Sequence, residues 1–275
     1  MLSTGKTKQK KHYFITRLFE IKNLLNKLQE RLKLKMLENK KVIIFDLDGT
    51  LIDSIGVWND IDKELIETVG NIGIDNVDIG KQRDEKLKEF NNSEDMYLEY
   101  CGFLGEKYKA DLSKEEIKKI RYEIAAKYLK NIIDYKPNAE KVLKVLKENG
   151  FTLVLATTTN DHTIKTYIEE NQNIINKAPL DKFFTLIYSK GAVKKLKPDP
   201  EIHNKILEEL KVKKEECLII EDSLIGVEAA INSGIDFIVM YDKFSDGNRE
   251  EINRLSKIQF NNFEEMLNQI EKEIK

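Results

Sequence analysis

Short apolar runs recur along the chain, separated mostly by segments with helical spacing. The run Val42–Phe45 is rich in β-branched residues and predicts a strand buried on both faces. Further runs predict strands at Phe151–Ala156, near 183–189, at Cys217–Ile220, at Phe237–Met240 and near 257–260. Helical patterns between them begin near 137, 161, 200 and 223. This alternation predicts an α/β fold: a doubly wound parallel sheet with helices on both faces.

The interval 55–133 has apolar residues at helical spacing and no strand-like alternation. Its apolar stripes lie at Val57–Ile66, Leu87–Phe90, Met96–Leu104 and Ile117–Leu129. Ser113–Glu116 is a capping box that predicts the start of the last long helix. We therefore predict an inserted all-helical domain at 55–133, a core domain formed by 41–54 and 134–275, and an N-terminal extension at 1–40.

The extension contains apolar residues at helical spacing between residues 14 and 32. Residues 1–35 carry eight Lys and two Arg against two Glu, a net charge of +8. A basic amphipathic helix of this kind is typical of segments that lie on a membrane surface or dock a partner. However, the stretch from Met36 runs straight into the first strand, as native chain starts commonly do. We interpret the preceding segment as dispensable.

Composition narrows the class of protein further. Hydrophobic and charged residues make up 41% and 34% of the 275 residues, which describes a soluble globular protein. The total net charge of −2 leaves −10 for the chain after residue 35, which argues against a nucleic-acid groove. No apolar run suits a membrane span, and the N-terminus lacks a signal-peptide core. Cys101 and Cys217 lie far apart, so we predict free thiols in a reducing cytoplasm.

Polar side chains fall at or just beyond the ends of the predicted strands. These clusters are Asp46 with Asp48, then Thr157, then Lys197, and Glu221 with Asp222. Since the carboxyl ends of parallel strands point the same way, we expect the clusters to converge on one crevice. A buried unpaired carboxylate costs several kcal/mol, so acids at this place predict a bound cation.

The string Asp46-Leu47-Asp48-Gly49-Thr50 resembles the first motif of the haloacid dehalogenase superfamily of aspartate-nucleophile phosphotransferases. The other three motifs are matched by Thr157, by Lys197-Pro198-Asp199-Pro200, and by Glu221-Asp222-Ser223 with Gly226. The resemblance covers about residues 41–262. It implies a Rossmann-like core, with segment 55–133 as the helical cap of the β-phosphoglucomutase-like branch. Taken alone, the first string could also be an ordinary Asp-Gly turn.

The resemblance implies Mg²⁺-dependent phosphoryl transfer. Asp46 is expected to attack phosphorus and form an aspartyl-phosphate. Asp48 is expected to protonate the leaving oxygen and later activate water, with its backbone carbonyl facing the metal. Asp222, together with Glu221, completes a site of hard oxygen ligands suited to Mg²⁺.

The remaining motif residues are expected to hold the phosphate. Thr157 offers a hydroxyl donor, exposed amides near Gly49 and Thr158 form an anion nest, and Lys197 balances negative charge. The run of three threonines leaves the register uncertain by one residue. Asp222 could alternatively be a helix N-cap. We expect His162 and His203 to be structural or solvent-facing.

The string Gly80–Glu85 resembles the cap segment that holds the far phosphate of the substrate in β-phosphoglucomutase relatives. Arg83 suits that task because its planar guanidinium grips phosphate with two hydrogen bonds. The competing interpretation is a solvated helix start, in which Arg83 has no contact with substrate.

These observations predict a Mg²⁺-dependent phosphatase of a small phosphorylated metabolite resembling a sugar phosphate. A sugar phosphomutase of the same branch is the alternative, although the cap histidine of such mutases would lie near Trp58, where this chain has none. An acid at Asp48 disfavours dehalogenation. A non-enzymatic, phosphate-responsive binding protein is a third possibility. The sequence does not name the substrate.

Overall fold

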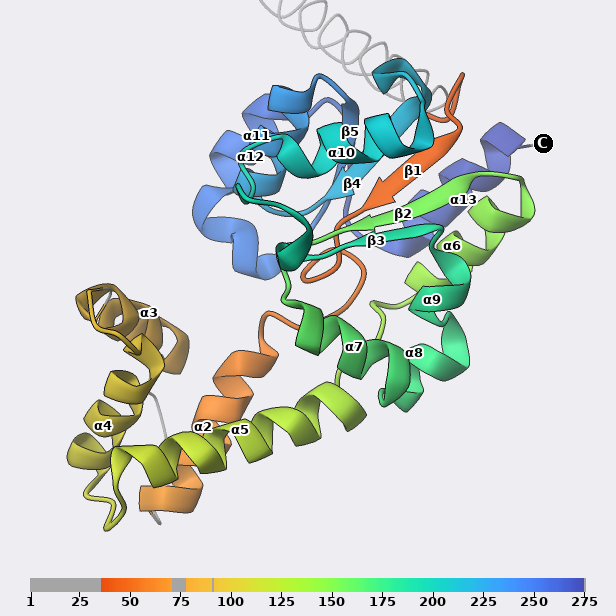
Figure 1. Ribbon diagram of the computed structural model, residues 1–275. Helices are drawn as coiled ribbons and strands as arrows, with labels where there is room; N and C mark the ends of the chain where they lie inside the picture. Colours follow the sequence, from red (N-terminus) through yellow and green to blue (C-terminus); the bar gives the residue numbers. More distant parts are fainter. Residues whose placement is uncertain (1–35, 71–77, 91, 275) are drawn as a thin grey trace, which may run out of the picture.

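The computed structural model of the protein describes residues 36–70, 78–90 and 92–274. The predicted helix at 14–32 lies outside the described residues. Six parallel strands form one sheet in the order β3-β2-β1-β4-β5-β6 (Figure 1). The strands are β1 (Val42–Phe45), β2 (Thr152–Ala156), β3 (Leu186–Tyr188), β4 (Cys217–Glu221), β5 (Asp236–Met240) and β6 (Gln259–Phe260). The predicted α/β fold with a parallel sheet is confirmed.

Helices cover both faces of the sheet (Figure 1). The core helices are α6 (Ala139–Glu148), α7 (Asp161–Glu169), α8 (Gln172–Lys177), α9 (Leu180–Phe183), α10 (Glu201–Leu210), α11 (Leu224–Ser233), α12 (Arg249–Leu255) and α13 (Phe263–Ile274). Three short 3₁₀ helices, η1 (Lys190–Ala192), η2 (Lys214–Glu216) and η3 (Lys243–Asn248), lie in the connections.

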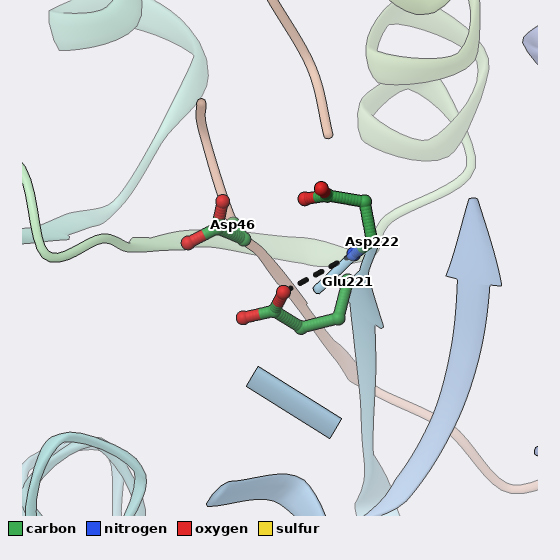
Figure 2. A group of neighbouring side chains, drawn as sticks. All are labelled: Asp46, Glu221 and Asp222. Carbon is green, nitrogen blue, oxygen red and sulfur yellow. Dashed lines mark hydrogen bonds between the residues drawn. The ribbon is translucent and has the colours of Figure 1, made fainter. Parts of the chain in front are cut away.

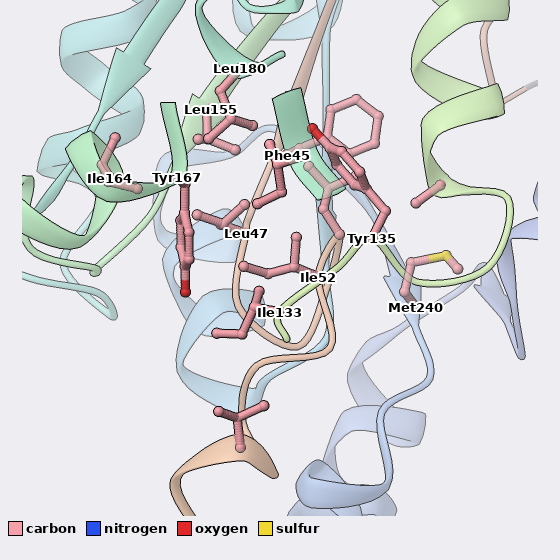
Figure 3. Packing of buried hydrophobic residues seen from close by; sticks show 14 of the residues in the cluster. Phe45, Leu47, Ile52, Ile133, Tyr135, Leu155, Ile164, Tyr167, Leu180 and Met240 are labelled. Carbon is pink, nitrogen blue, oxygen red and sulfur yellow. The ribbon is translucent and has the colours of Figure 1, made fainter. Parts of the chain in front are cut away.

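Strand β1 is buried on both faces, as its apolar sequence predicts. Ile43 and Phe45 belong to the larger hydrophobic cluster, with residues of α6, α7, α9 and α13. Figure 3 shows Phe45 in this cluster with Tyr167 of α7 and Leu180 of α9. Val42 and Ile44 belong to a second cluster with α10 and α11 on the opposite face. Alternate residues of one strand thus fill two cores, because side chains alternate across a sheet.

Strand β3 is shorter than the predicted run near 183–189. Pro179 precedes the single turn α9, in which the Phe183 amide donates to the Pro179 carbonyl. Phe183 is therefore the last residue of helix α9, and the strand begins only at Leu186 and ends at Tyr188. Strand β4 instead extends one residue beyond the prediction, because Glu221 pairs with Val239 of β5.

The described residues between β1 and α6 form four helices: α2 (Val57–Gly70), α3 (Ile79–Glu89), α4 (Met96–Tyr108) and α5 (Lys114–Asn131). They stand apart from the sheet (Figure 1). Their inward faces bury Ile61 and Leu65 of α2 against residues such as Ile117 of α5. The predicted capping box is present, since Ser113 accepts from the Glu116 amide and Glu116 accepts from the Ser113 amide. Among the described residues of this interval every regular element is a helix, as predicted.

Two chain segments connect the four helices to the sheet, and they run side by side. Ile52 and Tyr135 form an antiparallel bridge. The Lys136 amide donates to the Leu51 carbonyl at 2.8 Å, and the Asp53 amide to the Asp134 carbonyl at 3.1 Å. The division into domains at 54/55 and 133/134 stays a prediction. Both predicted boundaries lie next to these two paired segments.

The first described residues pack against the sheet domain. Met36 and Leu37 are buried in the larger cluster, and the Leu37 amide donates to Glu273 of α13 at 2.8 Å. Among the helices within 36–70, 78–90 and 92–274, none combines the length and apolar character that a membrane span needs. Cys101 and Cys217 are both buried free thiols, as predicted.

Candidate active site

The turn after β1 provides the first residues of the candidate site, Asp46 and Gly49. The Asp46 amide donates to the Ile220 carbonyl of β4 at 3.0 Å, which keeps Asp46 in register with the sheet. Gly49 follows with a φ of +84°, a conformation that favours glycine. A Cβ atom on Gly49 would lie 2.6 Å from Asp222 Oδ2, so the close approach of these two residues also requires glycine.

The backbone amide of Gly49 has a hydrogen-bond partner within its own turn. It donates to the Ile52 carbonyl at 3.1 Å within the turn. The anion nest of exposed amides near Gly49 stays a prediction, and the Gly49 amide itself is bonded within the turn. What Gly49 contributes is the absence of a side chain beside Asp222.

Lys197 is buried at the centre of the cluster. Its Nζ atom lies 2.7 Å from Asp46 Oδ1, 2.5 Å from Glu221 Oε1 and 2.8 Å from the Ala156 carbonyl. Burial disfavours the charged ammonium, but the Asp46 and Glu221 carboxylates outweigh it and raise the pKa of Lys197 above its ordinary value. The structure therefore brings Lys197 together with the acids of β1 and β4, as the sequence predicted.

Glu221 and Asp222 lie at the end of β4, facing Asp46 (Figure 2). Glu221 Oε2 accepts from the Asp222 amide at 3.1 Å, which orients its carboxylate toward Lys197. A Cβ atom on Gly226 would lie within 2.1 Å of the Glu221 carboxylate, so the first turn of α11 also needs glycine at this contact.

Asp222 is not the N-cap of α11. That position belongs to Ser223, whose Oγ accepts from the Gly226 amide at 3.2 Å. Both Asp222 oxygens accept hydroxyls instead: Oδ1 from Thr50 at 2.6 Å and Oδ2 from Ser245 at 3.2 Å. The alternative interpretation of Asp222 as a helix cap was therefore wrong.

Asp46, Glu221 and Asp222 can each place a carboxylate oxygen within 4.8 Å of the others. Burial and the neighbouring Glu221 raise the pKa of Asp46, and the same two causes raise the pKa of Asp222 to about 7. Lys197 contacts Asp46 and Glu221 but is one positive charge beside three buried carboxylates, so an excess of negative charge remains, which a divalent cation would neutralise. A cluster of oxygen ligands is what Mg²⁺ prefers, so these residues fit the predicted metal.

The Asp48 carboxylate is bonded to two hydroxyl groups and is not one of the three grouped carboxylates. Its Oδ1 accepts from Ser54 Oγ at 2.5 Å, and its Oδ2 accepts from Thr159 Oγ1. Burial raises the pKa of Asp48, although both hydroxyl bonds and Lys197 act in the opposite direction. Its role as a metal ligand, which rests on its backbone carbonyl, stays a prediction.

The three threonines after β2 have different surroundings. Thr157 is buried, its amide donates to the Tyr188 carbonyl at 2.9 Å, and its Oγ1 accepts from the Thr159 amide at 3.1 Å. Thr158 is half-buried. Sequence reasoning missed Thr159 and Ser54, which hold the Asp48 carboxylate. The sequence signal that could have indicated them is their position, since Ser54 follows the first motif and Thr159 follows Thr157.

Arg83 lies on α3 and pairs with a buried acid of α2. Its Nη1 atom lies 3.2 Å from Asp62 Oδ2, while Arg121 Nε lies 2.7 Å from Asp62 Oδ1. Arg83 also lines a cavity of about 620 Å³. Its lining residues are Ile55, Asn59, Asp78, Gly80, Lys81, Arg83, Glu85, Lys88 and Phe244.

This cavity bears on the two interpretations of Arg83. Its lining joins residues of α2 and α3 to Phe244, which belongs to η3 beside the site. The Arg83 side chain is only 14% exposed, which does not suit a fully solvated helix start. Contact between Arg83 and a substrate stays a prediction.

The two histidines have different surroundings. His203 on α10 is fully buried, and burial lowers its pKa to about 3. His162 is exposed. Neither residue takes part in the contacts of Asp46, Asp48 or Lys197 given above.

Comparison with known proteins identifies the family. A family model described as haloacid dehalogenase-like hydrolase matches residues 43–240. The chain belongs to the haloacid dehalogenase-like hydrolases. The family and the enzyme class predicted from the sequence are therefore confirmed.

Curated relatives cover most of the same region of this haloacid dehalogenase-like hydrolase. It is 27% identical over 206 residues to the phosphorylated carbohydrates phosphatase of Thermotoga maritima, covering 72% of this chain and 83% of the relative. It is 30% identical over 202 residues to the phosphoglycolate phosphatase of Aquifex aeolicus, covering 70% and 81%.

A solved structure has the same architecture. The crystal structure of a Thermotoga maritima protein, provisionally assigned as a β-phosphoglucomutase, superposes with a TM-score of 0.66 at 25% identity. The match covers 84% of this chain and 99% of that chain.

Proposed function

We propose that this haloacid dehalogenase-like hydrolase is a Mg²⁺-dependent phosphatase that hydrolyses a small phosphorylated metabolite through an aspartyl-phosphate on Asp46. The observation that carries the proposal is the buried cluster in which Lys197 bridges Asp46 and Glu221 beside Asp222. The names of the curated relatives support a phosphoric monoester hydrolase.

Asp46 is the proposed nucleophile. One of its oxygens, Oδ1, is held by Lys197, which fixes the orientation of the carboxylate and leaves Oδ2 to attack phosphorus. Attack forms the Asp46–phosphate bond and breaks the bond from phosphorus to the leaving oxygen. Lys197 then faces the charge that develops on the phosphoryl group. Bound to Asp46, Asp222 and Glu221, Mg²⁺ would neutralise the remaining negative charge.

Asp48 is the proposed acid and base. Because burial raises its pKa, the protonated form is available to donate to the leaving oxygen. The ionised Asp48 then removes a proton from the water that hydrolyses the aspartyl-phosphate. Ser54 and Thr159 fix the direction of its carboxylate through their hydroxyl bonds, and they must release or turn when Asp48 faces the substrate.

Thr157 and Thr158 are the proposed phosphate contacts after β2. The Thr157 hydroxyl accepts from the Thr159 amide and keeps its own proton for a phosphate oxygen. Thr158, half-buried at the same turn, offers its backbone amide to the anion. These contacts position the phosphate for in-line attack by Asp46.

The substrate is proposed to resemble a sugar phosphate. The cavity is lined by three cations, Lys81, Arg83 and Lys88, against the two acids Asp78 and Glu85, and Asn59 adds an uncharged polar group. Such a lining suits a leaving group with hydroxyls or a second anionic group. The carbohydrate-phosphate substrate named for the Thermotoga maritima phosphatase supports this class.

A sugar phosphomutase is the alternative function, supported by the name of the structural relative. The histidine of mutases in this branch is expected near Trp58, whose indole N–H is too weakly acidic to move a proton between sugar oxygens. The Trp58 ring instead lies 5.4 Å from the Arg121 guanidinium. A non-enzymatic binding role is disfavoured by membership of a hydrolase family and by the full set of catalytic groups.

The test is phosphate release from p-nitrophenyl phosphate, sugar phosphates, phosphoglycolate, nucleotides and polyol phosphates, with Mg²⁺ and with EDTA. We expect release that needs Mg²⁺ and that is fastest with a sugar or polyol phosphate. Isomerisation of a sugar phosphate without net release would support the mutase instead. Absence of turnover on all substrates would contradict the proposed function.

A further inference from the structure

Lys136 lies on the segment that returns from α5 to the core, and its side chain reaches the turn after β1. Its backbone amide bonds to Leu51 at 2.8 Å, which places it beside that turn. The Lys136 ammonium donates to the Gly49 carbonyl and lies 2.6 Å from Asp242 Oδ2. The Lys136 and Asp242 side chains are 15% and 5% exposed, so their ion pair is largely buried.

Asp242 begins a second segment that reaches the site. Asp242 Oδ1 accepts from the Phe244 amide at 2.8 Å, and its carbonyl accepts from Arg249 at 2.8 Å. These contacts fix the start of η3. One residue after Phe244, the buried Ser245 donates to Asp222 Oδ2 at 3.2 Å.

Each of the two segments that Lys136 joins supplies a hydroxyl group that bonds to Asp222. The turn that contains Gly49 continues to Thr50, whose hydroxyl donates to Asp222 Oδ1 at 2.6 Å. The segment that begins at Asp242 provides the Ser245 hydroxyl for Asp222 Oδ2. Each oxygen of Asp222 is therefore oriented by a hydroxyl on a segment that the Lys136 ammonium holds.

We propose that Lys136 is a positioning residue for the metal site: by holding Gly49 and Asp242 together, it fixes the two hydroxyls that orient Asp222. The inference rests on the proposed function, because Asp222 is assigned there as a ligand of Mg²⁺. Groups that orient metal ligands typically change metal affinity or activity by about 10–100-fold when they are removed.

The experiment compares the full-length protein with Lys136→Met, Lys136→Arg and Lys177→Met. Lys177→Met is the matched control, since the exposed Lys177 pairs with half-buried Asp134 on the same returning segment. Mg²⁺ affinity is measured by calorimetry, and kcat and KM are measured with p-nitrophenyl phosphate. We expect Lys136→Met to weaken Mg²⁺ binding about tenfold and to lower kcat, with KM changed less than about twofold. Lys136→Arg should retain most of the affinity, and Lys177→Met should match the wild type.

A double variant separates positioning from stability. Lys136→Met alone leaves the Asp242 carboxylate buried without its lysine, which destabilises the fold. Lys136→Met with Asp242→Asn removes both charges and should recover melting temperature. If Lys136 positions Asp222, the double variant regains stability but still binds Mg²⁺ about tenfold more weakly.

Wild-type Mg²⁺ affinity and kcat in the double variant would overturn the inference, and so would equal effects of Lys136→Met and Lys177→Met. Failure of the proposed function has a different signature. In that case the wild type itself would bind no Mg²⁺ or release no phosphate, whatever residue occupies position 136.

Discussion

The Lys197 ammonium lies 2.7 Å from Asp46 Oδ1 and 2.5 Å from Glu221 Oε1, so one buried cation joins the acid after β1 to the acid at the end of β4. With Asp222 beside them, the group carries three carboxylates and one ammonium, formally −2 when all are ionised. A buried charge of this size calls for a further cation, and a divalent ion would balance it.

Asp48→Asn should slow both half-reactions, because each needs a proton moved and asparagine cannot move it. General acid–base catalysis typically contributes 10²–10⁴-fold, so we expect a loss of about that size in kcat. The measurement is steady-state phosphate release. The neighbouring exposed Asp53 provides the matched control, and Asp53→Asn should keep a rate near that of the wild type. A fully active Asp48→Asn would remove Asp48 from the acid–base role.

Arg83→Ala tests whether the cavity beside α3 holds the leaving group. Loss of a charge-assisted hydrogen bond of ~1.5–3 kcal/mol predicts a fall of one to two decades in kcat/KM for substrates with a second anionic or strongly polar group. Hydrolysis of p-nitrophenyl phosphate should change little, since that substrate reaches only the Asp46 site. Asp62 keeps its bond to Arg121, which limits the damage to the fold.

The control for this variant is Arg254→Ala, which removes an exposed arginine paired with Glu251. It should leave both substrate classes unchanged. If Arg83→Ala affects p-nitrophenyl phosphate and the larger substrates equally, Arg83 does not contact the leaving group.

A chain that begins at Met36 should fold, bind Mg²⁺ and turn over normally. Met36 and Leu37 keep their buried positions, and the Leu37 amide keeps its bond to Glu273. The measurement compares melting temperature and kcat/KM of the truncated and full-length proteins. Insolubility or lost activity after truncation would show that residues 1–35 contribute to the folded protein.

His203 predicts how stability depends on pH. Its folded-state pKa of about 3 lies below the ordinary value of 6.5, so the unfolded chain binds a proton between these values and the folded chain does not. Stability should therefore fall as pH decreases from 6.5 toward 3, by up to about 1.4 kcal/mol per pH unit from this residue. The free energy of unfolding is measured by denaturant titration at several pH values.

The comparison uses His203→Gln and the exposed control His162→Gln. His203→Gln should reduce the slope of stability against pH in this window, whatever its absolute stability. His162→Gln should keep the wild-type slope. An unchanged slope in His203→Gln would mean that His203 is protonated in the folded protein.

The central part of the site was predictable because strand ends and charged residues coincide in the sequence. The apolar run Val42–Phe45 stops at Asp46, and Cys217–Ile220 stops at Glu221, so the parallel sheet alone brings these acids to one edge. Lys197 was predictable from its proline-rich context. The motif order therefore gave both the fold class and the cluster that carries the proposed chemistry.

Other contacts depended on tertiary structure. Three consecutive threonines have the same chemistry, and only the loop geometry decides that Thr159 meets Asp48 while Thr157 lies against the sheet edge. Lys136 is one of 46 basic residues and has no motif around it, so no pattern singles it out. Its partner Asp242 lies 106 positions away. Such a pair is visible only after the sheet has brought the two segments together.

The most direct test of the account is phosphate release by Asp46→Asn in saturating Mg²⁺. Asparagine keeps the shape of the side chain but lacks the nucleophilic carboxylate, so we expect no measurable turnover together with a melting temperature close to that of the wild type. The control Asp53→Asn, measured in parallel, should turn over normally. Turnover of Asp46→Asn within tenfold of the wild type would contradict the aspartyl-phosphate mechanism.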